Sequence, residues 1–413
     1  MTTVSRASIA ATDPDWHGTT PENISLSPEN RAWQPDILID TAERAIVVWS
    51  EERSGSRNIY FTEDVAGNWT MSQVISATAS PSQYPDVLAV GDEVFVAWVD
   101  GTFSTTIYEA RKTASTPWEA SQIPSPGSGG AIVRLAGGAG RLHALFNDFS
   151  DAKIYHTSRA LTAGSWPEAT PIYTSTAWGA WFPALATSTD GQTLHAAWQD
   201  QKSNDQIVIT YMSGVVNGAS IDWSPAITLS TEIAQSRLPD IEVDSEGDVH
   251  VVWGEPGSED KNEQYVRYTR YNDAADSWST PVRIDSVPVR VNTDNPTYIA
   301  PRLALWEGGN QVKICVAWYG FRTSDSSAED VLLRCSQDGG EAWSSATENV
   351  SRSRDAVEVG WGISFLPAAA FNTSGQLHLA WQERAGSQAT TDYEIYHSRV
   401  QHLVYLPLVM RNG

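Results

Sequence analysis

The sequence predicts an all-β protein that is built from seven copies of one structural unit. Two series of aromatic residues and the overall composition support this prediction. With 18 Trp and 14 Tyr among its 413 residues, the chain is rich in side chains that favour half-buried strands. Repetition at regular spacing indicates a repeat architecture, so it takes precedence over a domain count based on length. The first series closes seven short apolar runs, at Trp49, Trp98, Phe146, Trp198, Trp253, Trp318 and Trp381.

The second aromatic series follows the first at regular distances along the chain. The step is 20 residues in the early copies (49 to 69) and 25 residues in the later ones (198 to 223). Such regular spacing leaves no room for an inserted domain. The second series consists of Trp16, Trp69, Trp118, Trp166, Trp223, Trp278 and Trp343.

Each repeat contains signals for four short strands, which we name A to D in chain order. The A strand often has a Pro at its start, as at 35–38, 85–88 and 239–242, where the missing N–H group is tolerated. The B strand ends in the first aromatic series, the C strand is rich in Ile and Tyr (58–61), and the D strand begins with Trp (278–285). Turn residues such as 244–247 join A to B. Seven such units predict a seven-bladed β-propeller of four-stranded antiparallel blades, with residues 1–402 forming a single domain.

The seventh blade, residues 365–399, lacks a Trp-led D strand of its own. We predict that residues 14–27 supply this strand, because they carry the Trp and the Ser that the other D strands carry. Pairing the N-terminal strand with the last blade would remove a free sheet edge. The alternative is that residues 404–410, within an apolar tail at 403–413, form this strand instead.

Charge and hydropathy restrict the partners of the protein. The chain has 27 Lys and Arg against 50 Asp and Glu, giving a net charge of −23. This charge disfavours binding to nucleic acid and to anionic membranes. No run of 18 apolar residues predicts a membrane span. The tail at 404–411 resembles the apolar endings of many exported bacterial repeat proteins. We therefore expect an extracellular or cell-surface protein whose leader peptide is absent from this numbering.

The two cysteines, Cys315 and Cys335, lie in neighbouring predicted strands. A hairpin centred near residue 325 would place them opposite one another, at a separation that a disulfide can span. Two buried thiols are the alternative. Neither arrangement provides a metal site, and we expect no cofactor.

A ligand site is expected on the face that carries the D-to-A and B-to-C connections. These connections bring aromatic residues and arginines to the mouth of the central channel, where sugar rings and hydroxyls would find partners. Because blades five to seven have the longest connections, we expect the site to lie toward them. The same aromatic residues could instead pack blade against blade. The candidate ligand-binding residues are Arg237, Tyr298, Arg302, Trp361, Phe365, Trp33, Tyr84 and Trp181.

Acidic residues follow six of the seven B strands and form a second group of candidates. Paired carboxylates could catalyse glycoside hydrolysis, and a ring of them could hold Ca²⁺. A residue that repeats in six blades more often serves the blade itself, and the same holds for the His repeated at B-strand positions 143, 195, 250 and 378. The acids are Glu51 or Glu52, Asp100, Asp148, Asp200, Glu255 and Glu383.

Residues 336–343, Ser-Gln-Asp-Gly-Gly-Glu-Ala-Trp, resemble the Asp-box (BNR repeat) of sialidase-like β-propellers. The resemblance implies that Ser336, Asp338, Gly340 and Trp343 form a structural turn between the C and D strands, with the Trp packed between blades. Decayed copies end at Trp69 and Trp278. Together with the B-strand pattern, the resemblance covers nearly the whole chain.

Sialidases themselves have six blades, an Arg triad, a Tyr–Glu nucleophile pair and an Asp acid/base. This chain departs from that pattern in its seven repeats and in lacking a Phe-Arg-Ile-Pro motif, so we expect a non-sialidase member. Two functions remain open. The first is a secreted module, able to form oligomers, that binds a glycan or a protein without catalysis. The alternative is a glycoside-processing enzyme that uses carboxylates of the upper face.

Overall fold

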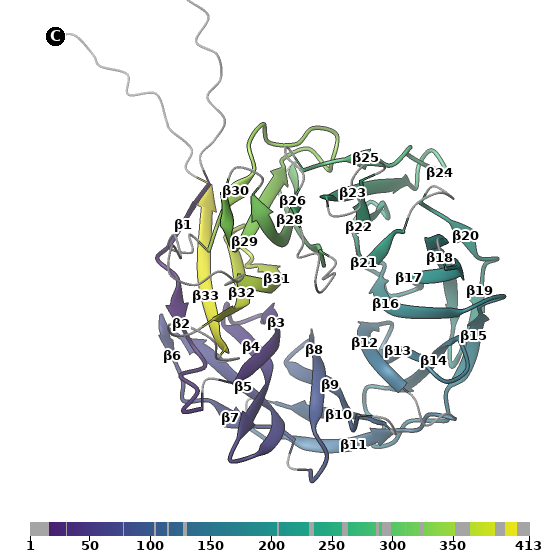
Figure 1. Ribbon diagram of the computed structural model, residues 1–413. Coiled ribbons are helices and arrows are strands. Elements are labelled where there is room, and N and C mark those ends of the chain that lie inside the picture. The colour runs from purple at the N-terminus through teal and green to yellow at the C-terminus, as the bar shows by residue number, and fades with distance from the viewer. Residues whose placement is uncertain are drawn as a thin grey trace, which may run out of the picture.

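The computed structural model is a ring of β-sheets, and the described part of the chain contains no helix. Seven four-stranded antiparallel blades surround a central channel in these residues, as the sequence predicts (Figure 1). None of the described residues forms a helix long and apolar enough to cross a membrane. The structure describes residues 16–29, 31–76, 78–102, 105–113, 115–126, 130–204, 206–230, 235–257, 263–285, 289–290, 299–309, 311–322, 325–351, 364–384 and 393–402.

The strands follow the predicted A-to-D order in every blade. Blade one contains β3 (Ala32–Ile39), β4 (Ala45–Arg53), β5 (Ser56–Val65), β6 (Asn68–Trp69) and β7 (Gln73–Val74). Blade two contains β8 (Ser82–Val90), β9 (Glu93–Asp100), β10 (Thr106–Lys112) and β11 (Glu119–Ile123). Blade three contains β12 (Gly130–Gly138), β13 (Arg141–Asp148), β14 (Lys153–Ala160) and β15 (Thr170–Thr174). Blade four contains β16 (Gly179–Thr187), β17 (Thr193–Ser203), β18 (Gln206–Asn217), β19 (Ser220–Trp223) and β20 (Ile227–Thr228).

The remaining blades have the same order, and a short strand joins two of them. Blade five contains β21 (Arg237–Val243), β22 (Val249–Pro256), β23 (Glu263–Asn272), β24 (Ser277–Trp278) and β25 (Val282–Arg283). Blade six contains β27 (Arg302–Gly308), β28 (Gln311–Arg322), β29 (Asp325–Ser336) and β30 (Glu348–Asn349). The short β26 (Val289–Arg290) pairs with both β23 and β28. Blade seven contains β31 (Ser364–Phe371), β32 (Leu377–Arg384) and β33 (Tyr393–His402), with β1 (Trp16–Gly18) and β2 (Glu22–Asn23) at its outer edge.

The N-terminal segment closes the ring, as predicted. Strand β1 pairs antiparallel with β33, and β2 pairs with the same strand further along (Figure 1). Ser25 follows β2, and its hydroxyl accepts a hydrogen bond of 2.9 Å from the Ile395 N–H group. Ser76, Ser230 and Ser351 accept the equivalent bond from the C strands of other blades. Residues 16–25 therefore occupy the D-strand position of blade seven. Residues 404–410, the rival for this position, lie outside the described part of the chain.

The core consists of seven apolar clusters, each of which joins the facing surfaces of two adjacent blades. The B-strand aromatic residue of one blade packs against the preceding blade, as Trp253 packs against Ile209 and Ala197. Because the large rings fill the wedge between twisted sheets, the first aromatic series marks blade interfaces. Burial of these rings explains why the repeat is so visible in the sequence.

The A-strand starts predicted at Pro35, Pro85 and Pro239 were wrong. Strands β3, β8, β16, β21 and β31 begin before the proline, which lies inside the strand at a register shift between it and the B strand. Such a shift is a β-bulge, where the ladder is interrupted and the missing N–H of proline costs no hydrogen bond. The bulge turns the residues around the proline toward the channel.

Candidate functional site

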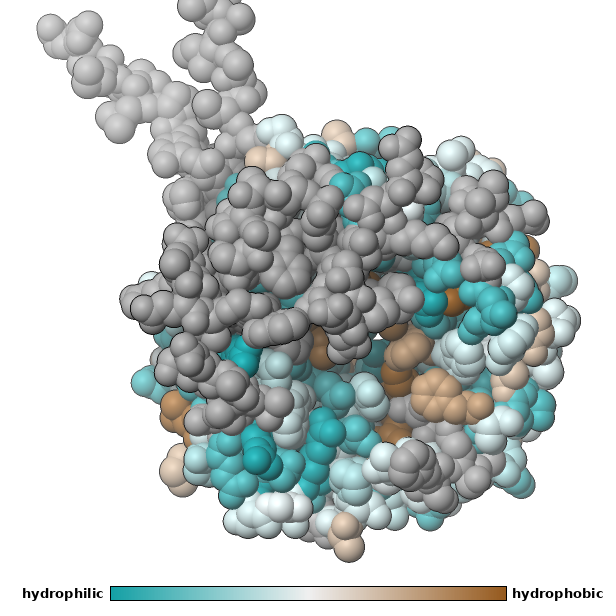
Figure 2. All heavy atoms as spheres, viewed as in Figure 1, coloured by the Kyte–Doolittle hydropathy of each residue, from teal (hydrophilic) through white to brown (hydrophobic). Residues whose placement is uncertain are grey.

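The mouth of the central channel forms a pocket of about 410 Å³, which we call the funnel. Its wall comes mainly from the A strands, which the ring gathers around the axis, and apolar side chains lie along the right-hand side of the central hollow in Figure 2. The described lining is Gln34, Pro35, Tyr84, Pro85, Ile132, Arg134, Phe182, Pro183, Leu238, Pro239, Ala300, Pro301, Arg302, Tyr319, Leu366 and Pro367.

Strained residues immediately before proline form a large part of the funnel wall. Among the described residues of the wall, five have left-handed backbones, with φ between 51° and 57°. A non-Gly residue in this region costs about 1–3 kcal/mol and persists only where its surroundings fix it. Glutamine side chains of the B strands provide part of this support: Gln382 Oε1 accepts from the Gln34 N–H (3.1 Å), and Gln199 Oε1 from the Leu238 N–H (3.2 Å). The strained residues are Gln34, Tyr84, Phe182, Leu238 and Leu366.

Two arginines provide the charged groups of the described funnel lining. Arg134 of β12 and Arg302 of β27 come from blades three and six, and both also line a second cavity deeper in the channel. Their side chains are 16% and 31% exposed, so both guanidinium groups remain within reach of a ligand. The other polar groups of the wall are the side chains of Gln34, Tyr84 and Tyr319.

The deeper cavity, which we call the chamber, has a volume of about 250 Å³ and gathers carboxylates from three blades. Asp36, Asp86 and Asp240 occupy equivalent A-strand positions just after the proline. One oxygen of each accepts the backbone N–H of the next blade, at 2.8 Å from Val87, 2.7 Å from Leu135 and 2.8 Å from Leu303. The chamber carboxylates therefore fasten neighbouring A strands to one another around the axis.

The second carboxylate oxygens of Asp86 and Asp240 face the two arginines. Arg134 Nη1 lies 3.4 Å from Asp86 Oδ1, and Arg302 Nη1 lies 3.7 Å from Asp240 Oδ1. Burial raises the pKa of Asp86 to about 7, with Arg134 opposing and Asp36 reinforcing the shift. Burial likewise raises the pKa of Asp36. Burial, together with the negative charge of Asp240, raises the pKa of Glu242 to about 8. Burial and the nearby Arg302 lower the pKa of Arg134. The chamber is thus a desolvated site where protonation is poised near neutral pH.

The acids that follow the B strands lie outside the channel and serve the blades. Glu51 accepts from the indole Nε1 of Trp49 at 2.7 Å, and Asp100 accepts from Trp98 at 2.8 Å. The pairs Trp253–Glu255 (3.3 Å) and Trp381–Glu383 (2.7 Å) repeat this bond. Trp318 has no acid two residues later, and its Nε1 is buried without a hydrogen-bond partner. Four of the six acids are therefore indole acceptors, whereas Asp200 accepts from the Tyr173 and Ser175 hydroxyl groups and the Trp198 indole has no partner. Both roles are internal to the blades, so the geometry of these acids gives the catalytic interpretation no support.

The repeated histidines belong to seams between blades. His195 Nδ1 lies 2.7 Å from the Tyr211 hydroxyl, and the Tyr211 ring packs edge-on against Trp278 of the next blade at 4.9 Å. His143 pairs with His156 in the same way, with Nδ1 and Nε2 3.2 Å apart. Burial lowers the pKa of His143 and of His195 to about 4. These histidines are neutral packing elements at neutral pH.

The predicted Asp-box segment forms a tight turn after β29. The Ser336 hydroxyl donates to Asp338 Oδ1 (2.7 Å) and accepts the Gly340 N–H (2.8 Å), while Asp338 Oδ1 accepts the Ala342 N–H (2.9 Å). The Trp343 ring lies edge-on against Tyr268 of blade five, with centroids 5.0 Å apart. All these contacts are internal to the fold, so the segment has a structural role.

Cys315 and Cys335 lie opposite one another in β28 and β29, with Cα atoms 4.1 Å apart, and form a disulfide. Cys315 occupies the B-strand position that His195 and His250 occupy in other blades, three residues before the buried Trp. Blade six thus replaces the histidine contact with a covalent bond.

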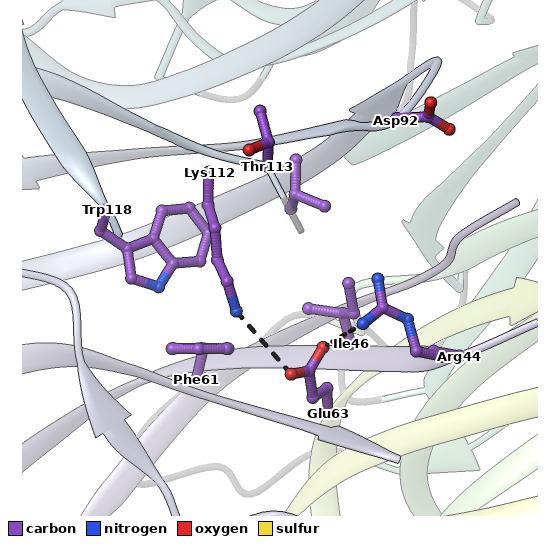
Figure 3. Close-up of a pocket in the computed structure, with 9 residues that line it drawn as sticks. Arg44, Ile46, Phe61, Glu63, Asp92, Lys112, Thr113 and Trp118 are labelled. Atoms are coloured by element: carbon purple, nitrogen blue, oxygen red, sulfur yellow. Dashed lines mark hydrogen bonds and ion pairs between the residues drawn. The ribbon is translucent and has the colours of Figure 1, made fainter. Parts of the chain in front are cut away.

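A small pocket between blades one and two contains paired charges (Figure 3). Glu63 lies between Arg44 Nη1 at 2.9 Å and Lys112 Nζ at 3.7 Å. The Lys112 ammonium also lies 4.6 Å from the Phe61 ring centroid. With a volume of about 60 Å³, this pocket is too small for a sugar.

The structure places the predicted ligand-binding residues in different surroundings. Tyr84 and Arg302 line the funnel. Trp33, Trp181 and Arg237 lie one residue before the strained positions and are absent from the described funnel lining, and the Trp33 ring packs under Arg57 at 4.4 Å. Tyr298 and Trp361 lie outside the described residues, as does the side chain of Phe365, so the expected bias toward blades five to seven stays a prediction.

Neither Arg134 nor the chamber carboxylates stood out in the sequence as site residues. The available signal was the Pro-Asp pair at 35–36, 85–86 and 239–240, which places a charge inside an otherwise apolar A strand. The described residues contain no group of three His, Cys, Asp or Glu side chains suited to a metal ion. The expectation of Ca²⁺ at the B-strand acids therefore has no geometric support there.

Comparisons with solved structures identify related folds. The first is a protein of unknown function from Dyadobacter fermentans, 12% identical, with a TM-score of 0.57 over 94% of this chain and 99% of that one. An endosialidase of phage phi92 is 10% identical, with a TM-score of 0.53 over 96% and 70% of the two chains. An α-L-arabinofuranosidase of Fusarium graminearum, solved with an iminosugar inhibitor, is 12% identical, with a TM-score of 0.51 over 94% and 98%.

The chain is similar in fold to sialidase-like β-propellers. At these identities the similarity extends to the fold alone. No protein-family model matches the chain, and a sequence comparison with curated proteins gives no match.

Proposed function

We propose that this propeller is a carbohydrate-binding module whose ligand enters the funnel. The observation that carries the proposal is the funnel itself: a concave, mostly apolar wall with a tyrosine at its rim and two arginines at its base. Small-molecule sites typically combine such a wall with a few convergent polar groups. Proline and aromatic faces suit the C–H faces of sugar rings, while guanidinium groups donate to hydroxyl or carboxylate oxygens.

The arrangement of carboxylates favours binding without catalysis. The described funnel wall carries no carboxylate, because Asp36, Asp86 and Asp240 lie in the chamber below it. Each of these three uses one oxygen to hold the next blade. A secreted protein fits this proposal, since a disulfide such as Cys315–Cys335 persists in oxidising compartments.

The test is a glycan array of neutral and acidic sugars, followed by calorimetric titration of the strongest binder. We expect Arg302→Met and Tyr84→Ala to weaken binding by about tenfold or more, which corresponds to about 1.4 kcal/mol. Arg111→Met is the matched control, because Arg111 is paired with Glu119 away from the channel. An array without any bound glycan, or equal affinity in all variants, would overturn the proposal.

A glycoside-processing enzyme is the second candidate, and one observation favours it. Asp36 and Asp86 are adjacent chamber carboxylates with raised pKa values, and that of Asp86 is about 7, suitable for a general acid. Turnover of aryl glycosides that is lost in Asp86→Asn, with folding intact, would support this candidate over simple binding.

A further inference from the structure

An exposed group of aromatic rings lies beside the funnel at the junction of blades three and four. Phe149, in the B-to-C turn of blade three, is 54% exposed, and Trp178, in the connection to blade four, is 60% exposed. The Trp181 ring of β16 lies 6.2 Å from that of Phe149. We call these three residues the platform. Other exposed large apolar residues, such as Met71 and Leu26, belong to other blades.

The backbone around the platform holds it in place. The Trp178 N–H donates to the Gln201 carbonyl at 3.1 Å, and the Ser175 N–H donates to the Ala152 carbonyl at 3.0 Å. Trp181 pairs with Gln199 in the ladder of β16 and β17. Gly179 makes room for the Trp181 indole, because a Cβ atom there would lie 2.3 Å from the ring. The backbone of the platform and the Trp181 ring are therefore ordered, which reduces the conformational entropy lost when a ligand covers them.

Buried polar groups at the same junction lack partners. The Trp181 Nε1 donor is buried without a hydrogen bond, and so are both polar atoms of the Asn147 side chain. Gln199 and Gln382 occupy the position of Asn147 in blades four and seven, and each accepts an N–H from the next blade. Asn147 is one methylene shorter and makes no such bond. Most buried polar side-chain atoms in native proteins have a hydrogen-bond partner, so these unpaired groups at one junction require an explanation.

The platform adjoins the funnel along β16. Trp181 directly precedes Phe182, which lines the funnel wall and is followed by Pro183. A funnel of about 410 Å³ has the size of a small-molecule site and excludes a folded partner domain. An occupant that covers both surfaces is therefore an extended chain of small units with flat apolar faces.

We propose that Phe149, Trp178 and Trp181 form a stacking subsite for a further sugar residue, so that the ligand is an oligosaccharide that runs from the platform into the funnel. This inference rests on the proposed carbohydrate-binding function. It adds a length requirement and a direction to that function, because one sugar ring fills the funnel while its neighbours cover the platform.

The experiment uses an array that carries glucose, galactose, arabinose and galacturonic acid, each as the monosaccharide and as chains of two to six units. Trp178→Ala is expected to lower affinity for the longer chains by about tenfold while leaving monosaccharide binding unchanged. Arg302→Met should weaken both. Gly179→Ala, which displaces the Trp181 indole, should behave like Trp178→Ala, and Met71→Ala is the exposed control.

The outcomes separate the two proposals. If no sugar binds the unaltered protein, the carbohydrate-binding function fails and the subsite fails with it. If sugars bind with an affinity that is independent of chain length and of Trp178, the subsite is overturned while the funnel proposal stands. A protein ligand that is lost in Trp178→Ala, with no sugar bound, would also overturn the subsite.

Discussion

Two positions of the blade differ in how much their residue changes from one blade to the next. The residue two places after the B-strand aromatic is acidic in six blades, and in four of these it accepts an indole hydrogen bond in the described structure. The A-strand residue at one equivalent register position varies instead, and in every blade except the fourth it lines the chamber. It is Asp36, Asp86, Arg134, Ala184, Asp240, Arg302 or Ala368 in blades one to seven.

The comparison separates residues that maintain the blade from residues that give the ring an asymmetric interior. A position that keeps the same residue type in most copies performs a task within the blade, such as satisfying a buried indole. A ligand breaks the symmetry of the ring, so the residues that bind it must differ between blades. Variation at one geometric position therefore indicates function better than repetition does.

The largest effect is expected for the aromatic residue that the repeated acid serves. Trp98 is 1% exposed and packs against blade one, so Trp98→Ala should destabilise the protein by about 3–5 kcal/mol. Urea unfolding followed by circular dichroism measures this loss. Trp178→Ala, at an exposed site, should change stability by less than about 0.5 kcal/mol. Similar losses in both variants would contradict the assigned packing.

The disulfide that replaces the histidine contact in blade six should have the next largest effect. It closes a loop with a sequence separation of 20, for which chain entropy gives a stabilisation of about 3 kcal/mol. A reducing agent, or the pair of changes Cys315→Ala and Cys335→Ala, should lower the urea midpoint accordingly. An unchanged midpoint in reducing agent would show that the bridge is absent in solution.

Removing a repeated acid should have a smaller effect than removing its aromatic partner. Asp100→Ala leaves the buried Trp98 indole without an acceptor, at a cost of about 1–3 kcal/mol. Asp100→Asn, which keeps an acceptor oxygen, should recover most of the loss. If both variants were as stable as the unaltered protein, accepting the indole hydrogen bond would not explain why an acid is repeated at this position.

The smallest effects are expected from the pH dependence of the variable chamber position. The pKa of Asp86 is raised to about 7, so its contribution to stability is complete below pH 3.8 and is lost as pH rises through 7. In Asp86→Asn this loss should disappear, so the variant should gain in melting temperature relative to the unaltered protein between pH 5 and pH 8. If the melting temperatures of the two proteins changed with pH in the same way across this range, the Asp86 carboxyl would be solvated and its pKa would not be raised.

The histidine seams should act in the opposite direction. The pKa of His143 and that of His195 are lowered to about 4, so these neutral side chains stabilise the fold above pH 6.5 and lose that contribution as pH falls through 4. Replacing His195 by Gln should therefore flatten the acid side of the stability profile and leave the alkaline side unchanged. An unchanged acid side would rule out the lowered pKa.

Particular residues show how far the sequence could predict the site. Arg302 and Tyr84 were expected near the channel and line the funnel, because the connections before the A strands do meet at the axis. Trp33 and Trp181 were expected there too. The described lining instead contains the residue that follows each of them, Gln34 and Phe182. Side chains alternate along a strand, so a bulge that shifts the alternation by one residue changes which of two neighbours faces the axis.

The sequence by itself determined the number of blades, the order of their strands and the closure by Trp16 to Ser25. These features depend on local patterns of burial that each repeat carries in full. Only the tertiary structure decided that Arg134, Arg302 and three aspartates meet around one cavity, because they come from five blades that lie far apart along the chain. The closed ring brings these charges to one axis, and no single repeat shows which residues of the other blades they will face there.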